Sequence, residues 1–227
     1  MTDLEYPVRR PYKSALLILT VALGVFLYMQ SDTFRRHYKP LLLAYIYSFM
    51  DNKSSKSAKN ISIGSSTVER MDHERYLACG KWRNRGFGSS VISHSIEYIK
   101  HQAFSHNTKS ILVYAGENDI AYGKNTKQTL VDFKKLIGLL SVKYPKAMIN
   151  IFAIKLSPKR TVFSKAYIKL NKDINAYAAT LKNAMFFSSK LSNNILNDSK
   201  FYLTDQLHLS HEGYRELTRE FNIKCKK

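Results

Sequence analysis

Residues 60–67 read Asn-Ile-Ser-Ile-Gly-Ser-Ser-Thr, and this stretch decides the fold that we expect. Its first four residues alternate in the manner of a strand, and a turn of small residues follows before a helical pattern begins. At such a strand-to-helix turn, the hydroxyl of Ser66 would be exposed over the edge of a sheet. The stretch therefore predicts a strand followed by a nucleophilic serine. Helix N-capping by Ser65 or Ser66 is the alternative explanation.

Further short apolar runs alternate with helical periodicity, which is typical of a parallel sheet covered by helices on both faces. Beyond residues 60–63, strands are expected at 81–85, 110–114, 148–154 and 184–188. Three helices are expected from apolar residues at helical spacing: Ile92, Ile96 and Ile99; Leu130, Phe133, Ile137 and Leu140; and Tyr214, Leu217 and Phe221. A fourth helix is expected from Ser66 to Tyr76. Such a fold places its chemistry at the carboxyl ends of the strands.

The loop from Asn84 to Ser90 follows one of these strands. Its two glycines, Gly86 and Gly88, allow unusual dihedral angles and a close approach of substrate to backbone N–H groups. The loop is therefore a candidate source of hydrogen bonds to a developing oxyanion, although a loop with two glycines is common.

The sequence Gly116-Glu117-Asn118-Asp119 closes the strand at 110–114. Asn118 can donate its side-chain amide to an oxyanion, and Asp119 can bind backbone amides that hold the turn at Gly116. An ordinary Asx turn is the alternative.

Asp205 and His208 lie just before the last expected helix. At this spacing in a loop, the carboxylate can reach Nδ1 of the imidazole while Nε2 faces a distant nucleophile, as a general base requires. His211 is a weaker candidate, because it falls in the first turn of that helix. A metal pair is the alternative, but no third ligand is evident among the other histidines, and no metal is expected.

The composition is that of a folded globular protein, with 44% hydrophobic and 12% aromatic residues among 227. The two cysteines, Cys79 and Cys225, form neither a disulfide framework nor a metal-ligand pattern. A bridge between them is conceivable in an oxidising compartment, but Cys225 is expected in a mobile basic terminus.

The formal net charge is +19, and residues 58–227 carry 28 Lys and Arg against 13 Asp and Glu. Such a surface favours anionic neighbours, such as an acidic polymer or a lipid surface. Lysines used only for solubility are the alternative. The lysines are scattered and no basic cluster is interleaved with aromatic residues, so no specific nucleic-acid partner is expected.

Residues 12–29 are apolar except for Lys13, and arginines flank them on both sides. As a helix, this segment would span roughly 27 Å, which is close to the thickness of a bilayer core. We expect an uncleaved, single-pass transmembrane anchor, preceded by a basic flank at 1–11. A buried soluble helix and a cleaved secretory signal peptide are the alternatives.

A second apolar run at 41–50 is too short to cross a bilayer. It is expected to form an interfacial helix or a helix packed on the domain, and a polar linker is expected from Asp51 to Asn60. Residues 30–57 would thus form a juxtamembrane helix and linker, and residues 58–227 the catalytic domain. We expect this domain on the exported side of the membrane.

Taken together, the stretches resemble the four motif blocks of the SGNH, or GDSL-like, hydrolases, in their order and strand context from residue 58 to about 222. The blocks are Ile63-Gly64-Ser65-Ser66, Asn84-Arg85-Gly86-Phe87-Gly88-Ser89-Ser90, Tyr114-Ala115-Gly116-Glu117-Asn118-Asp119 and Asp205-Gln206-Leu207-His208-Leu209-Ser210. The resemblance implies a flavodoxin-like three-layer α/β/α fold with a central parallel sheet. It also implies ester hydrolysis without a metal or an organic cofactor.

The resemblance further implies a role for each motif residue. Ser66 would attack an acyl carbonyl, His208 would take and return the proton, and Asp205 would orient His208. The oxyanion would be met by the N–H groups of Ser66 and Ser89 and by the side chain of Asn118.

Two positions depart from the usual pattern of these hydrolases. Ser65 stands where many members have Asp, which leaves the nucleophile unchanged. Ser89 stands where an oxyanion glycine is usual. Serine keeps the backbone N–H but disfavours a positive φ, and its side chain narrows the pocket.

The function expected from these residues is that of a membrane-anchored serine esterase that removes acetyl or other short acyl groups from a cell-surface glycan. A lysophospholipase or other lipid esterase is the second hypothesis, motivated by the apolar N-terminal segment and the basic surface. Acyl transfer to a surface glycan is the third. The fourth is a degenerate, non-catalytic domain that binds an anionic polymer or a membrane.

Overall fold

The computed structural model describes residues 11–54, 59–103, 105–193 and 199–225, with side chains described from residue 18 onward. Five parallel strands form one sheet in the order β2-β1-β3-β4-β5. The strands are β1 (Asn60–Gly64), β2 (Trp82–Gly86), β3 (Ser110–Tyr114), β4 (Met148–Phe152) and β5 (Ala184–Phe187). All five predicted strands are present, and β4 ends two residues earlier than expected.

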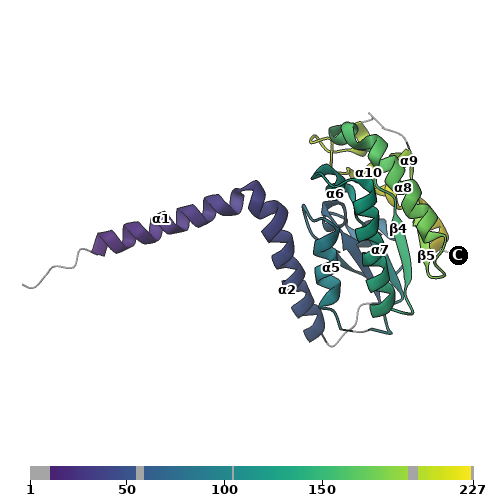
Figure 1. Cartoon of the computed structure of the whole chain (residues 1–227), viewed down its shortest axis with the longest axis horizontal. Coiled ribbons are helices and arrows are strands. Elements are labelled where there is room, and N and C mark those ends of the chain that lie inside the picture. Colours follow the sequence, from purple (N-terminus) through teal and green to yellow (C-terminus); the bar gives the residue numbers. More distant parts are fainter. Residues whose placement is uncertain (1–10, 55–58, 104, 194–198, 226–227) are drawn as a thin grey trace, which may run out of the picture.

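Helices cover both faces of the sheet, as the alternation of elements predicts (Figure 1). One layer contains α5 (Ile92–Lys100), α7 (Thr126–Lys143) and α8 (Ser164–Ala178). The other contains α3 (Ser66–Glu69), α4 (His73–Tyr76), α9 (Lys190–Asn193) and α10 (His211–Cys225). The short elements α6 (Glu117–Ala121), η2 (Pro158–Phe163) and η3 (Ser199–Phe201) complete the loops. The three-layer α/β/α fold is thus confirmed.

The central strand β3 shows how the sequence builds two cores. Ile111 and Val113 are buried with the residues of α5, α7 and α8, whereas Leu112 and Tyr114 are buried on the opposite side with those of α10. Successive side chains of a strand point to opposite faces, so an unbroken apolar run is what a sheet covered on both sides requires. Each such side chain contributes about 1.5–3 kcal/mol when it is buried.

The expectation of one helix from Ser66 to Tyr76 is wrong. The chain forms α3 and α4 instead, and Asp72 separates them as the N-cap of α4. The side chain of Asp72 accepts a hydrogen bond from the N–H of Arg75 at 3.1 Å. An Asp at this position favours a new helix start over a continuous helix, because its carboxylate satisfies an amide that has no partner within the helix.

The N-terminal part of the structure consists of α1 (Pro11–Gln30), the π-helical η1 (Phe34–Tyr38) and α2 (Lys39–Lys53). Figure 1 shows α1 extending away from the domain. None of the helices, within the described residues, is both long enough and apolar enough to cross a membrane. The predicted transmembrane anchor at 12–29 is therefore not supported, and the predicted basic flank lies outside the described residues except for Pro11.

The apolar run at 41–50 belongs to α2, which packs on α5. Ala44 is fully buried in the core, and the hydroxyl of Ser48 donates a hydrogen bond to the carbonyl of Tyr98 at 3.2 Å. Of the two expectations for this run, the structure shows the helix packed on the domain. Asp51, expected in a polar linker, is part of this helix. The division of the chain between residues 57 and 58 stays a prediction.

The two cysteines form a disulfide, with their Cα atoms 6.1 Å apart. Cys225 is the last residue of α10 and not part of a mobile terminus, because the helix continues to that point. The bridge joins α10 to the segment between α4 and β2, on the side of the sheet that α10 covers.

Candidate active site

Ser66, His208 and Asp205 form a continuous chain of hydrogen bonds. Ser66 is the first residue of α3, directly after β1, and its Oγ lies 3.2 Å from Nε2 of His208. Nδ1 of His208 lies 2.5 Å from Oδ2 of Asp205. Both loop residues precede α10, as predicted. The structure therefore brings together three groups that are separated by up to 142 positions in the sequence.

The carboxylate of Asp205 is held by its own loop as well as by the imidazole. Oδ1 of Asp205 accepts the N–H groups of Leu207 at 3.0 Å and His208 at 2.9 Å. Burial raises the pKa of this carboxyl, but the hydrogen bonds from the side chain and amide of His208 and from Leu207 outweigh it and hold the pKa well below its usual range. The ionised carboxylate fixes the orientation of the imidazole, with Nδ1 toward Asp205 and Nε2 toward Ser66.

The structure also bears on two alternative interpretations, which are helix capping by Ser65 or Ser66 and a catalytic role for His211. Ser65 is the N-cap residue of α3, but its side chain makes no capping hydrogen bond. Because the hydroxyl of Ser66 contacts His208, neither serine acts as a side-chain cap here. His211 begins α10, and its Nδ1 lies 2.9 Å from the hydroxyl of Tyr76, so it is engaged away from Ser66.

In the loop after β2, the residue with an unusual backbone conformation is Ser89 and not one of the glycines. Ser89 itself adopts a positive φ of 63°, whereas Gly86 and Gly88 do not. The expectation that these glycines supply unusual dihedral angles is therefore wrong, and close packing explains them instead. A Cβ atom on Gly86 would lie 2.0 Å from the backbone N of Glu69, and one on Gly88 would lie 2.5 Å from Oε2 of the same residue.

The amide of Ser89 is free to bind a ligand. Among the described residues, its N–H has no acceptor. The left-handed conformation is the one that glycine adopts most easily, so the serine bears a local conformational cost at this position. The serine nevertheless keeps the N–H group that the sequence assigns to an oxyanion site.

Asn118 and Asp119 lie in α6, after a turn at Gly116 whose φ is 106°. The side-chain amide of Asn118 donates one hydrogen bond to the carbonyl of Ser90 at 2.7 Å, which fixes its orientation. The second amide hydrogen remains for a ligand. Asp119 accepts the N–H of Ile92 at 3.0 Å, which ties this turn to the start of α5, and it also pairs with Lys124 at 3.1 Å. Burial raises the pKa of Asp119.

A cavity of about 280 Å³ opens at these groups. It is lined by Ser66, Ser89, Asn118 and His208, together with Gly88, Leu207, Tyr122, Glu69, Arg35, Lys39, Arg70 and Arg160. Most of these residues are polar or charged. The predicted nucleophile, base and oxyanion donors therefore share one polar pocket at the carboxyl end of the sheet.

No protein-family model matches the sequence, and neither does any of the curated proteins. Solved structures are similar in fold. A Streptococcus pneumonia protein described as a candidate platelet activating factor is 19% identical, with a TM-score of 0.73 over 90% of this chain and 99% of that one. A lipolytic G-D-S-L family protein from Veillonella parvula is 19% identical, with a TM-score of 0.59 over 71% and 94%. A family 3 carbohydrate esterase from Clostridium thermocellum is 18% identical, with a TM-score of 0.58 over 73% and 94%.

This chain has the SGNH hydrolase fold. The likeness covers 90% and 71% of this chain in the first two comparisons, and the fold implied by the sequence resemblance is confirmed. Of the residues assigned from that resemblance, Ser66, Ser89, Asn118 and His208 line one pocket, and Asp205 contacts His208.

Beneath the pocket, this SGNH fold holds a buried charged cluster that joins Glu117 of the third motif block to two cations outside the four blocks. Glu117 forms ion pairs with Lys155 at 2.7 Å and with Arg160 at 3.1 Å. The hydroxyl of Tyr114 donates to Oε2 of Glu117 at 2.6 Å. Burial raises the pKa of Glu117, but its two cationic partners outweigh burial, so the pKa lies below its usual value. The unusual lysine in the apolar run 151–156 is the only sequence signal for this cluster.

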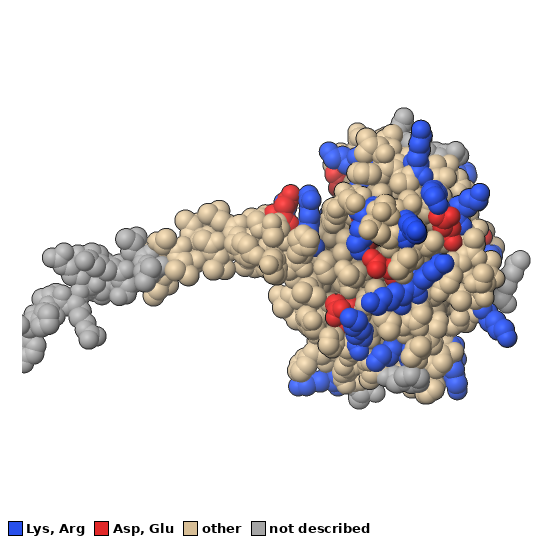
Figure 2. All heavy atoms as spheres, in the orientation of Figure 1, with Lys and Arg blue, Asp and Glu red and all other residues tan. Residues whose placement is uncertain are grey.

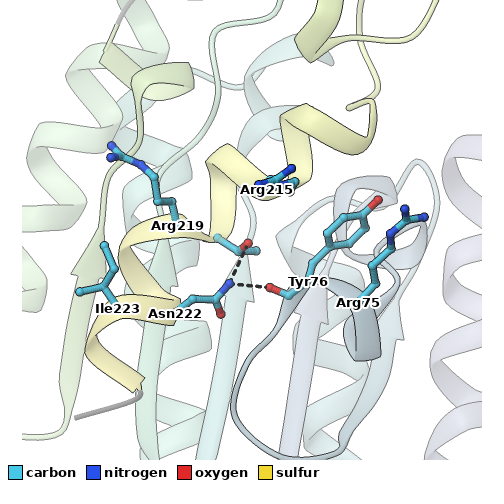
Figure 3. Close-up of a pocket in the computed structure, with 7 residues that line it drawn as sticks. Arg75, Tyr76, Arg215, Arg219, Asn222 and Ile223 are labelled. Atoms are coloured by element: carbon cyan, nitrogen blue, oxygen red, sulfur yellow. Dashed lines mark hydrogen bonds between the residues drawn. The ribbon is translucent and has the colours of Figure 1, made fainter.

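A second hollow of about 340 Å³ lies between α4 and α10 (Figure 3). It shares no lining residue with the pocket at Ser66. The side chain of Asn222 in this hollow donates to the carbonyl of Tyr76 at 2.8 Å and accepts the N–H of Ala78 at 2.9 Å, so it joins the two segments. Arg215 and Arg219 form ion pairs within α10, with Glu212 and Glu216 respectively. Asn222, Arg215 and Arg219 thus have partners of their own.

Within the described ranges, no three His, Cys, Asp or Glu side chains are grouped as metal ligands. The imidazole of His208 is engaged with Asp205 through Nδ1 and with Ser66 through Nε2.

Proposed function

We propose that this protein hydrolyses short-chain acyl esters of a polar substrate, such as the O-acetyl groups of a glycan. The observation that carries the proposal is the hydrogen-bonded chain from Ser66 through His208 to Asp205, which opens into a polar pocket. A serine, an imidazole and a carboxylate in this order form a nucleophile, a general base and the group that orients the base.

Each step follows from these positions. Nε2 of His208 accepts the proton of Ser66 as Oγ attacks the acyl carbon. The N–H groups of Ser66 and Ser89 and the side-chain amide of Asn118 stabilise the oxyanion. The imidazolium then returns the proton to the leaving alcohol, which leaves an acyl-serine. Water, deprotonated by His208, attacks this ester and releases the carboxylic acid. Ser66 regains its proton from His208.

The lining of the pocket supports a short acyl group and a polar alcohol. A long acyl chain needs a continuous apolar surface. Only Leu207 and Tyr122 offer substantial apolar surface among the lining residues. One of the structural neighbours is a carbohydrate esterase, which supports the same choice. Hydrolysis of a lipid ester and acyl transfer to a glycan remain the alternatives.

Hydrolysis of aryl acetate, butyrate and octanoate esters by the full chain tests this proposal. Ser66→Ala is expected to lower kcat by roughly 10⁴-fold or more, because removal of the nucleophile leaves only binding and oxyanion stabilisation. Ser65→Ala is the matched control, since Ser65 is the neighbouring, buried hydroxyl outside the hydrogen-bonded chain. Preference for acetate supports a glycan substrate, and preference for octanoate supports a lipid. Equal, negligible activity in folded wild-type protein and Ser66→Ala contradicts esterase function and favours a binding domain.

We also propose that α1 attaches the protein to a lipid surface, with the domain on the exported side. Nine large apolar side chains of α1 are exposed: Ile18, Leu19, Val21, Leu23, Val25, Phe26, Leu27, Tyr28 and Met29. Exposed apolar area of this extent is costly in water. Figure 2 shows this part of α1 without charged side chains, in contrast to the domain. Flotation with lipid vesicles tests the attachment, and a chain that stays with the unbound fraction contradicts it.

A further inference from the structure

The pocket at Ser66 is lined by four cationic side chains, which we call the cationic wall: Arg35, Lys39, Arg70 and Arg160. They come from different parts of the chain. Arg35 lies in η1, Lys39 begins α2, Arg70 is the C-cap residue of α3 and Arg160 lies in η2. One carboxylate, that of Glu69, lines the same pocket. The wall therefore carries an excess of positive charge close to the predicted nucleophile.

The charge of Arg160 is only partly neutralised. Arg160 pairs with Glu117, but Glu117 also pairs with the buried Lys155, so two cations share one carboxylate. The side chain of Arg160 is 13% exposed, and its pairing with Glu117 fixes its orientation before any substrate binds. A cation that is held in place and partly desolvated binds an anion at a small entropic cost.

The other three cations differ in how they are paired. Arg35 forms an exposed ion pair with Asp32 at 2.6 Å, which is weak in water. Neither Lys39 nor Arg70 forms an ion pair with a carboxylate in the part of the chain that the structure describes. Arg70 and Lys39 are therefore available to a ligand.

The N-terminal segment is held against the pocket by defined contacts. The guanidinium of Arg36 lies 4.8 Å from the ring centre of Tyr122, which lines the pocket. Asp51, at the other end of α2, forms ion pairs with Arg83 and Arg85 of β2. Arg35 and Lys39 thus belong to the pocket in the folded chain, although they precede the sheet by more than twenty residues.

We infer that the ester substrate carries an anionic group, a carboxylate or a phosphate, on the sugar that bears the acyl group. This inference rests on the proposed function. With the acyl carbonyl at Ser66, the anion faces the cationic wall, where Arg70 and Arg160 bind it. The guanidinium of each arginine matches a carboxylate or phosphate with two parallel hydrogen bonds. The anion is thereby a determinant of specificity, separate from the groups that perform the chemistry.

The first experiment compares acetylated sugars with and without one anionic group. Acetate release is measured from the methyl glycoside of acetylated glucuronic acid and from its neutral methyl ester, and from acetylated glucose 6-phosphate and acetylated glucose. The full chain is expected to prefer the anionic member by about tenfold or more in kcat/KM, since hydrogen bonds to charged groups are the strong ones. The larger of the two preferences identifies carboxylate or phosphate. The preference is expected to fall as salt is raised.

Variants locate the anion on the wall. Arg70→Gln and Arg160→Gln are each expected to reduce the ratio of kcat/KM for the anionic and neutral esters by about tenfold. Arg215→Gln is the matched control, because Arg215 lines the hollow in Figure 3 and not the pocket at Ser66. A reduction caused by Arg215→Gln as large as that caused by Arg70→Gln would assign the preference to overall charge and overturn the inference.

Failure of the inference and failure of the proposed function give different results. Equal rates on charged and neutral esters would overturn the inference and leave the esterase intact. No hydrolysis of any ester would contradict the esterase. In that case calorimetry with the deacetylated methyl glucuronoside, with glucose 6-phosphate and with their neutral counterparts reads the anion site without turnover. Binding of the anionic sugars but not of their neutral counterparts would support the anion site. Equal binding of both, or no binding of either, would overturn it.

Discussion

The pocket has two sides of different origin. One side, the motif wall, consists of Ser66, Ser89, Asn118 and His208. Each of these residues lies in a segment that connects a strand of the sheet to a helix that covers it, or just before such a helix. The cationic wall includes residues of η1 and α2, which lie outside the sheet and its connections. The proposed chemistry and selectivity of this site thus depend on different kinds of structure. The motif wall depends on short turns, and half of the cationic wall depends on the packing of an N-terminal helix.

The two sides also differ in how their carboxylates are used. The side chain of Asp205 is 46% exposed and is held by hydrogen bonds from His208 and Leu207. That of Glu117 is 4% exposed and is held by two cations. The first carboxylate orients a base, whereas the second fixes a cation that faces the pocket. The motif wall thus relies on directed hydrogen bonds and the cationic wall on charge.

The largest expected effect is on the motif wall. Asp205→Asn is expected to lower kcat on an aryl acetate by roughly 10⁴-fold, because an amide no longer fixes the tautomer of the imidazole that accepts the serine proton. Circular dichroism checks that the variant is folded. A folded variant with more than a tenth of the wild-type kcat would contradict the role of Asp205 in orienting His208.

The pH dependence of wild-type activity gives a further test of the role of Asp205. The pKa of Asp205 is lowered in the folded chain, so its carboxylate stays ionised as the pH falls to about 4, the usual pKa of aspartate. Loss of wild-type activity above that pH is therefore expected to arise from another group. The stability that ionised Asp205 contributes is present above the unfolded pKa and is lost only as the pH falls through the folded pKa.

The second effect concerns the support of the cationic wall. The carboxylate of Asp51 is 5% exposed and binds Arg83, Arg85 and the hydroxyl of Tyr98. Asp51→Ala is expected to lower the free energy of unfolding by about 3–5 kcal/mol, because it removes the buried carboxylate that pairs with the half-buried guanidinium of Arg85. Asp32→Ala is the control, since Asp32 is 63% exposed in its pairs with Arg35 and Arg36 and is worth about 1 kcal/mol or less. Urea unfolding of the full chain measures both.

Equal effects of these two substitutions would contradict the view that α2 is an integral part of the fold. Acid provides a second test. Burial raises the pKa of Asp51, but hydrogen bonds from Arg85 and Tyr98 and the nearby positive charges outweigh it, so the pKa is lowered. The contribution of Asp51 is thus present above the usual pKa of aspartate and is lost as the pH falls through the lowered value. The difference between wild type and Asp51→Ala should narrow in that range.

The smallest effect is expected at Ser89. Ser89→Gly relieves the positive φ of 63° but increases the freedom of the unfolded chain, so the free energy of unfolding is expected to change by about 1 kcal/mol or less. The N–H group is retained, and kcat on an aryl acetate should change less than the 10²–10³-fold typical for loss of an oxyanion donor. A loss of that size would show that the serine side chain itself contributes to the reaction.

Local patterns were sufficient for much of the fold. The β-branched and apolar runs identified all five strands, because a strand buried on both faces must be apolar along its length. The same reasoning failed between Ser66 and Tyr76, where Asp72 begins a second helix. It also placed Asp51 in a linker, because a charged residue at the end of an apolar run is locally typical of a loop. Its partners in β2 and α5, which are distant in the sequence, explain why its side chain is buried.

By itself, the sequence determined the strands, the order of the motifs and the spacing of Asp205 and His208, because these depend on interactions between neighbours in the chain. Tertiary structure decided which cations face Ser66. Arg35 and Lys39 reach the pocket through the packing of α2 on α5, and Arg160 is oriented by Glu117, forty-three positions earlier. Contacts of this kind depend on how whole elements pack, and no local periodicity encodes them.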